Sequence, residues 1–232
     1  MHNTQPELQT SVGRLAATHE GTGDRRAYFD ALYAASDPYG TRDRWYERRK
    51  RQILLSSLPR PTYDRVFEPA CGTGELTREL AARSSHVLAS DFCEDAVAQA
   101  RARLCALDNV SFGNHRIPSD WPRSDPAFDL IVVSEVCSFL HLAEIEAVAQ
   151  HCARSMTPDG VLAVCDWRWP FDARVTRAED AHRVFSSLAL HPLVQHAEDD
   201  FLLGVWSAEL DDGEALRIGR TYLRKVKAMA GR

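Results

Sequence analysis

Short apolar runs alternate along the chain with segments whose apolar residues recur at helical spacing. The run Leu130–Val133 is apolar throughout, which is typical of a central parallel strand. The patterns predict strands over residues 64–68, 86–90, 110–112, 130–133 and 161–165, and helices over residues 76–83, 96–104, 142–156 and 178–188. This alternation predicts βαβ units and a mostly parallel sheet with helices on both faces.

Two further apolar runs, over residues 193–196 and 201–206, end this pattern. Only residues 197–200 separate them. Because so short a link cannot hold a crossover helix, the two strands are predicted to be antiparallel. We therefore expect an α/β protein with a seven-stranded, mostly parallel sheet and an antiparallel last strand.

The composition narrows the class of protein. The chain has 232 residues, of which 44% are hydrophobic, and a formal net charge of −5. The apolar content excludes disorder for most of the chain, and no apolar run reaches the roughly 20 residues of a membrane-spanning helix. A general nucleic-acid binder is more often basic, and the polar start is unlike a signal peptide. We expect a cytoplasmic protein with neither a membrane nor a nucleic-acid partner.

The six cysteines and nine histidines show no spacing typical of metal ligands. No two cysteines form a C-x-x-C pair, and most fall inside apolar runs, as reduced core cysteines do. The sequence therefore predicts no metal site and a reducing compartment.

A glycine-containing loop follows the first predicted strand in the segment Glu68-Pro69-Ala70-Cys71-Gly72-Thr73-Gly74. Glycines at alternate positions let the backbone turn tightly and approach a ligand, because no Cβ stands in the way. Asp91 ends the second predicted strand, where an acid can accept both hydroxyls of a ribose. The loop and the two acids favour a nucleoside ligand at the carboxyl ends of the strands.

A dinucleotide is not favoured at this loop. The third glycine of that motif falls at Thr77, whose branched side chain would obstruct close packing, and no G-K-[ST] sequence marks a triphosphate site. The expected ligand has a free ribose and no phosphate, which fits S-adenosyl-L-methionine. A purely structural turn is the simpler alternative.

The segment Glu68–Gly74 resembles the first motif of the class I S-adenosylmethionine-dependent methyltransferases. Phe128–Val132 is similar to the family's fourth-strand motif, and Thr157–Gly160 to its turn before strand five. The resemblance covers roughly residues 28–207 and implies a Rossmann-like class I methyltransferase fold. It also implies S-adenosyl-L-methionine as the methyl donor, which becomes S-adenosyl-L-homocysteine after the transfer. It implies cofactor contacts from Glu68, Ala70, Gly72, Gly74, Asp91 and Phe92.

A closer resemblance is to the nodulation-protein-S-type methyltransferases, which N-methylate an amino sugar. It rests on the segments Asp37–Tyr39, Trp45–Lys50, Trp121-Pro122 and Ser134–Val136. The resemblance implies that Tyr39 is a lid residue and that Lys50 binds the methionine carboxylate of the cofactor, with Arg49 as the alternative. It also places Ser134 and Glu135 beside the cofactor. The alternative is that the aromatic residues of this segment are core residues and the basic ones form a solvated helix face.

The chain is expected to have four segments. These are a flexible arm over residues 1–27, a helical lid over 28–60, the cofactor-binding domain over 61–210 and a helical tail over 211–232. The tail is predicted because apolar residues recur at helical spacing after the turn at residues 211–213.

The chain departs from the family pattern after the third predicted strand. Many members carry an acid there that binds the adenine amino group, whereas this chain has Arg116, which cannot accept a hydrogen bond. Either Asn114 or a backbone carbonyl takes over, or cofactor binding is weaker than usual.

Three side chains are candidates for the chemistry of methyl transfer. An amine must lose its proton to act as a nucleophile, so a proton acceptor helps. Glu135 follows the fourth strand, His141 opens the next helix and Asp166 ends the fifth strand. Glu135 is favoured, because a carboxylate after so apolar a strand is costly without a partner or a role. His141 as a surface residue and Asp166 as the partner of an arginine are the alternatives.

Three hypotheses about function follow. The leading one is N-methylation of a small-molecule amine or amino sugar by a monomer or homodimer. The second is O-methylation of a hydroxylated metabolite, for which His141 would be the more natural base. The third is a cofactor-binding protein without turnover, which the arginine at residue 116 motivates.

Overall fold

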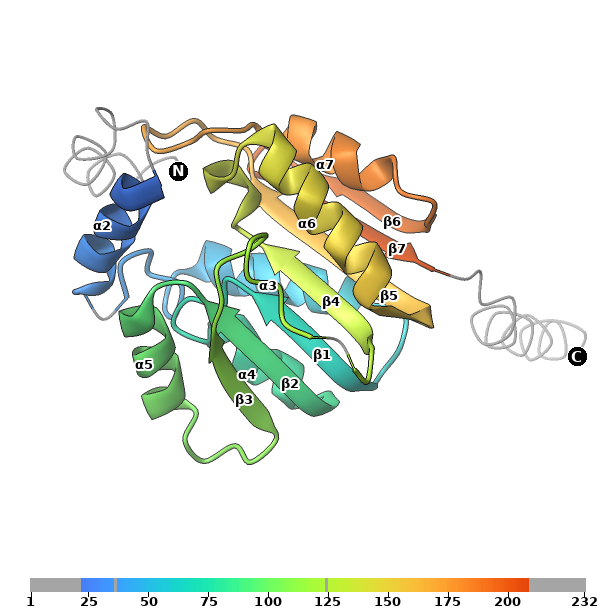
Figure 1. Cartoon of the computed structure of the whole chain (residues 1–232), viewed down its shortest axis with the longest axis horizontal. Helices are drawn as coiled ribbons and strands as arrows, with labels where there is room; N and C mark the ends of the chain where they lie inside the picture. The colour runs from blue at the N-terminus through green and yellow to red at the C-terminus, as the bar shows by residue number, and fades with distance from the viewer. Residues whose placement is uncertain (1–21, 36, 124, 209–232) are drawn as a thin grey trace, which may run out of the picture.

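The computed structural model describes residues 22–35, 37–123 and 125–208. Seven strands form one sheet in the order β3-β2-β1-β4-β5-β7-β6 (Figure 1). The strands are β1 (Tyr63–Pro69), β2 (Ser84–Asp91), β3 (Val110–Asn114), β4 (Phe128–Ser134), β5 (Met156–Trp167), β6 (His191–Ala197) and β7 (Phe201–Ser207). Strands β1 to β5 pair in parallel, whereas β7 is antiparallel to both of its neighbours. The predicted mostly parallel sheet with an antiparallel last strand is therefore confirmed.

The helices connect the strands in the predicted alternation. They are α2 (Thr22–Tyr33), α3 (Trp45–Ser57), α4 (Glu75–Ala81), α5 (Glu94–Arg103), α6 (Leu142–Ser155), α7 (Ala178–Ser186) and the short 3-10 helix η1 (Cys137–Phe139). Helix α6 lies on one face of the sheet, and α3 and α4 lie on the opposite face (Figure 1).

The apolar run Leu130–Val133 of strand β4 is buried on both faces. Leu130 and Val132 pack into the core under α3 and α4, while Ile131 and Val133 pack into the core under α6 and α7. Successive side chains of a strand point to opposite faces, so a central strand covered twice must be apolar at every position. The continuous run predicted this central position.

Two boundaries differ from the sequence-based expectations. The expected turn Thr157–Gly160 lies within β5, because Met156 pairs with Phe128 and the register shifts between Phe128 and Leu130. Helix α2 begins at Thr22, so the expected boundary between arm and lid at residue 27 falls inside a helix. The expected tail over residues 211–232 lies outside the described residues.

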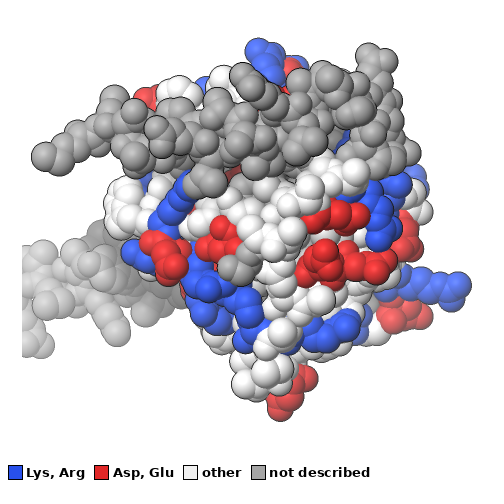
Figure 2. Space-filling view, turned by 90° about the vertical axis from the view of Figure 1, so that its left-hand side faces the viewer, with Lys and Arg blue, Asp and Glu red and all other residues white. Residues whose placement is uncertain are grey.

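All six cysteines carry free thiols, and five of them are buried. The described residues contain no group of three His, Cys, Asp or Glu side chains able to hold a metal ion. Among the helices of the described ranges, none has the length and hydropathy needed to cross a bilayer. On the described surface visible in Figure 2, basic and acidic side chains are interspersed.

Candidate cofactor and acceptor pocket

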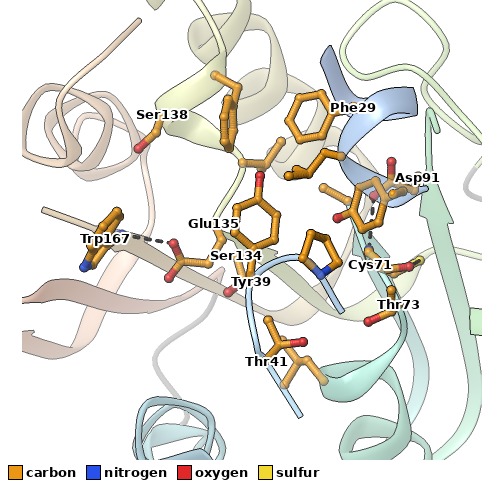
Figure 3. A pocket seen from close by; sticks show the side chains of 18 of the residues that line it. Phe29, Tyr39, Thr41, Cys71, Thr73, Asp91, Ser134, Glu135, Ser138 and Trp167 are labelled. Carbon is orange, nitrogen blue, oxygen red and sulfur yellow. Dashed lines mark hydrogen bonds between the residues drawn. The ribbon is translucent and has the colours of Figure 1, made fainter. Parts of the chain in front are cut away.

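A pocket of about 280 Å³ opens at the carboxyl ends of the central strands. Chain segments after β1, β2, β4 and β5 line it, and helix α2 with the segment after it lies against it. Strand order reverses between β1 and β4, and ligands of open α/β sheets bind at such a reversal. Tyr39 lies in the middle of the pocket, with Glu135 and Trp167 on one side and Asp91 on the other (Figure 3).

The loop after β1 needs left-handed backbone at three positions. Ala70, Gly72 and Gly74 have φ values of 59°, 53° and 83°. A Cβ on Gly72 would lie 3.0 Å from the hydroxyl of Tyr33, which reaches over the loop from α2. Ala70 and Gly72 line the pocket, so the predicted close approach of backbone to a ligand fits their geometry.

Gly74 has a different role, because it faces helix α5 rather than the pocket. A Cβ there would lie 3.0 Å from Leu104 Cδ1 and 3.2 Å from Ala100 Cβ. Gly74 is the N-cap residue of α4. It therefore supports the loop by close packing between two helices.

Replacement of Gly74 by alanine should destabilise the fold by about 1–2 kcal/mol, since it adds both a left-handed strain and a steric contact. Urea unfolding measures the change. Ala70→Gly is the matched control, because it removes a Cβ at a left-handed position and should alter the free energy of unfolding by less than about 1 kcal/mol. Equal stability of Gly74→Ala and the parent protein would contradict this role.

Asp91 accepts two backbone hydrogen bonds at the end of β2. The N–H of Gly72 donates to Oδ2 at 3.1 Å, and the N–H of Cys93 donates to Oδ1 at 3.0 Å. Burial raises the pKa of Asp91 to about 6, and the backbone donors oppose that rise. A carboxylate has about four acceptor sites, so two remain for a ligand in the pocket.

Glu68 lines the pocket from β1, and Thr77 holds it. The Thr77 hydroxyl donates to Glu68 Oε2 at 2.6 Å. Burial raises the pKa of Glu68 to about 8, although the bond from Thr77 lowers it. The branched residue that argued against a dinucleotide motif thus orients an acid of the loop.

Lys50 lies between two carboxylates, and all three side chains line the pocket. Its Nζ is 2.7 Å from Glu135 Oε1 and 3.0 Å from Glu47 Oε2. Burial lowers the pKa of Lys50, but the two carboxylates raise it by more, so the net direction is upward. The ammonium therefore stays charged and bridges α3 to the segment after β4.

Glu135 has an unusual backbone conformation for a residue with a side chain, with φ of 59°. Its N–H donates to the carbonyl of Cys165, and its Oε2 accepts the N–H of Trp167 at 3.3 Å (Figure 3). Burial raises the pKa of Glu135 to about 6, with the Lys50 ammonium opposing the rise. Such left-handed residues persist where the surroundings hold them, and they cluster at active sites.

The pocket brings together most of the predicted site residues. They are Tyr39, Lys50, Glu68, Ala70, Gly72, Asp91, Phe92, Ser134 and Glu135. Arg49 is directed elsewhere, because both of its terminal nitrogens lie 2.7 Å from Glu198. Asn114 donates to the backbone carbonyl of Asp91 at 2.9 Å, while its neighbour Arg116 lines the pocket.

Two of the three predicted catalytic residues do not line the pocket. His141 is the exposed N-cap residue of α6, and its N–H donates to Glu144 at 2.8 Å. Asp166 is fully buried, where it accepts the N–H of Cys137 at 3.2 Å and lies 3.6 Å from His182. It therefore holds the segment after β4 and has no access to a ligand.

Several lining residues were not predicted from the sequence. They include Tyr28, Tyr33, Glu47, Ser138, Phe139, Phe171 and Asp172. The spacing of Glu47 and Lys50, three residues apart on a helix, could have revealed one of them. The others lie in the pocket through tertiary packing, for which the sequence carries no periodic signal.

Comparisons with known proteins agree with this geometry. A family described as a methyltransferase domain matches residues 66–160. A crystal structure from Pseudomonas syringae, described as that of a candidate methyltransferase, is 38% identical with a TM-score of 0.63, over 71% of this chain and 99% of that one. A demethylmenaquinone methyltransferase of Clavibacter sepedonicus is 30% identical over 51% of this chain and 47% of its own length.

Nodulation protein S is matched both in sequence and in structure. The Rhizobium tropici protein is 29% identical over 61% of this chain and 59% of its own length. The N-methyltransferase NodS from Bradyrhizobium japonicum WM9, solved with S-adenosyl-L-homocysteine, is 23% identical with a TM-score of 0.70, over 78% of this chain and 97% of that one. The chain spans between about half and three fifths of the length of these curated relatives.

Proposed function

Because the chain belongs to the S-adenosylmethionine-dependent methyltransferases, we propose that it methylates the nitrogen of a small-molecule amine, with amino sugars among the candidate acceptors. The observation that carries the proposal is the carboxylate of Glu135. It lines the pocket beside Ser134 and Trp167, across Tyr39 from the loop and Asp91 (Figure 3). Its pKa of about 6 leaves it mostly ionised at neutral pH.

The cofactor supplies a methyl group on a sulfonium sulfur. For its ribose, Asp91 offers the acceptor sites that its two backbone donors leave free. The left-handed backbone at Ala70 and Gly72 leaves room for the methionine part, and Lys50 offers a cation for its carboxylate. Phe92 lines the same end of the pocket and offers a face to the adenine.

Glu135 is proposed to orient the acceptor and to take up the proton that the nitrogen loses. In the transfer, an N–C bond forms, the C–S bond breaks and its electron pair stays on sulfur. The nitrogen that receives the methyl group needs a free lone pair for this step, so a carboxylate beside it that can take its proton favours the reaction.

O-methylation of a hydroxyl group is the second candidate, and the geometry disfavours its simplest form. That route relies on His141 as the base, and His141 does not line the pocket. The curated relatives nevertheless include a malonyl-[acyl-carrier protein] O-methyltransferase. The choice between nitrogen and oxygen acceptors is therefore open to direct test.

A panel of amines and phenols, incubated with the protein and methyl-labelled S-adenosyl-L-methionine, tests the proposal. We expect label to enter amines, with phenols and alcohols giving at most a few per cent of that rate. Mass spectrometry of each product locates the methyl group. Label found only in the hydroxyl compounds would overturn the N-methylation proposal and keep the family assignment.

A further inference from the structure

We propose that four aromatic rings at one end of the pocket form a subsite for an alkylammonium group, so that the preferred acceptor is an alkyl-substituted amine that binds as its ammonium form and loses its proton to Glu135 before the methyl transfer. The rings belong to Tyr28, Phe139, Trp167 and Phe171, which all line the pocket. The statement about the preferred acceptor rests on the proposed function. Binding to the subsite can be tested without any methyl transfer.

The four rings form a continuous series. The ring centroids of Tyr28 and Phe139 are 6.4 Å apart, those of Phe139 and Phe171 are 5.3 Å apart, and those of Phe171 and Trp167 are 5.8 Å apart. All four side chains are half-buried. They come from α2, η1, the end of β5 and the segment after it, so chain segments far apart in the sequence converge on one wall.

Carboxylates accompany this aromatic wall. Glu135 accepts the backbone N–H of Trp167 at 3.3 Å, and Asp172 follows Phe171 in the chain and also lines the pocket. Aromatic faces attract a cation within about 6 Å of the ring centroid, most strongly where water is excluded. Rings beside carboxylates suit a ligand that presents both a positive charge and carbon surface.

The protein already binds one of its own cations in this way. The ammonium of Lys50 lies 5.1 Å from the ring centroid of Tyr46 and 2.7 Å from Glu135 Oε1. Glu135 therefore combines with an aromatic ring to hold an ammonium group on the α3 side of the pocket. The aromatic wall offers the same combination on the side of Trp167.

The test compares choline with 3,3-dimethylbutan-1-ol, which has the same shape and no charge. Both are titrated by calorimetry into the full chain saturated with S-adenosyl-L-homocysteine, at constant ionic strength. We expect choline to bind at least about fivefold more tightly than the neutral compound. Phe171→Leu and Trp167→Leu should each weaken choline about threefold to tenfold and change the neutral compound less.

Trp169→Leu is the matched control, because this exposed tryptophan bonds to Asp200 at 2.6 Å and does not line the pocket. It should leave both affinities unchanged. Thermal unfolding identifies a variant that fails to fold, and the other ring variant then carries the test.

Equal affinity for choline and its neutral isostere would overturn the proposal, since the wall would then be only hydrophobic. The proposal is also overturned if both ring variants keep the parent protein's ratio of affinities for choline and the neutral compound. A protein that prefers choline but methylates none of the amines supports the subsite and contradicts the proposed function. Methylation of amines by a protein that shows no preference for choline supports the proposed function and contradicts the subsite.

Discussion

Glu135→Gln should lower kcat for amine methylation about a hundredfold to a thousandfold, the range for loss of a proton acceptor at the reacting group. Glutamine preserves the shape of the side chain and can still accept the N–H of Trp167 through its carbonyl oxygen. It cannot take up a proton. Lys50 keeps Glu47 as a partner at 3.0 Å, so the ammonium is not left unpaired. Initial rates at saturating cofactor measure the effect.

The pH profile separates proton transfer from simple orientation. Because the pKa of Glu135 is raised to about 6, its ionised form dominates above pH 6 and is lost as the pH falls below that value. An acceptor amine with a pKa above about 9 binds as its ammonium form over this range, and the Glu135 carboxylate takes its proton, so kcat of the parent protein should be flat between about pH 6 and 9. The parent protein should lose activity tenfold per pH unit below pH 6, whereas Glu135→Gln, which has no proton acceptor, should show a tenfold rise per unit up to the pKa of the amine.

Glu146→Gln provides the control, since Glu146 is an exposed carboxylate on α6 outside the pocket. It should retain the kcat and pH profile of the parent protein. If Glu135→Gln keeps kcat within threefold and retains the acid limb, Glu135 serves only as the partner of Lys50.

The sheet could be predicted because burial on two faces leaves a clear pattern. The buried run Leu130–Val133 of β4 must be apolar at every position, and the three-residue link between β6 and β7 can only join antiparallel neighbours. The start of β5 was predicted at residue 161, whereas the strand begins at Met156, which pairs with Phe128; residues 157–160 have no partner in β4 and form the irregularity between the two stretches of pairing. Strand ends are decided by the partner strand, which a single segment does not encode.

The residues at strand ends were predictable for the same topological reason. Parallel strands end at one edge, so Asp91 and Glu135 had to lie at the same edge of the sheet. The choice between Arg49 and Lys50 depended on helix phase. Lys50 shares a face with Glu47, three residues earlier, whereas Arg49 is rotated by about 100° toward Glu198.

Three rings of the aromatic wall, those of Tyr28, Phe139 and Phe171, were not predictable from any period in the sequence. Phe171 lies in an irregular segment after β5, and Tyr28 lies on a helix whose position depends on distant contacts. Arg25 on α2 bonds to Glu144 on α6 at 3.2 Å, while Arg26 bonds to Glu94 on α5 at 2.9 Å. These ion pairs connect α2 to α6 and α5. Side chains from such segments meet only after the chain has folded.

Asp91→Ala should weaken S-adenosyl-L-homocysteine binding by about 1.5–3 kcal/mol, which is roughly a 10- to 150-fold rise in Kd. The variant removes the charged acceptor proposed for the ribose. It also frees the N–H groups of Gly72 and Cys93, so some stability should be lost. Asp91→Asn keeps one oxygen for these donors and separates the two effects. Calorimetry measures the affinity, and urea unfolding measures the stability.

The affinity should also depend on pH with a defined sign. Burial raises the pKa of Asp91 to about 6, so the ionised carboxylate that accepts ribose hydroxyls is lost as the pH falls below 6. Affinity of the parent protein should therefore drop between pH 7 and pH 5, while Asp91→Asn should show a flatter profile. Asp108→Ala, at an exposed position beyond α5, should match the parent protein. Unchanged affinity in Asp91→Ala would mean that the ribose binds elsewhere, and no binding to the parent protein at millimolar ligand would contradict the cofactor site itself.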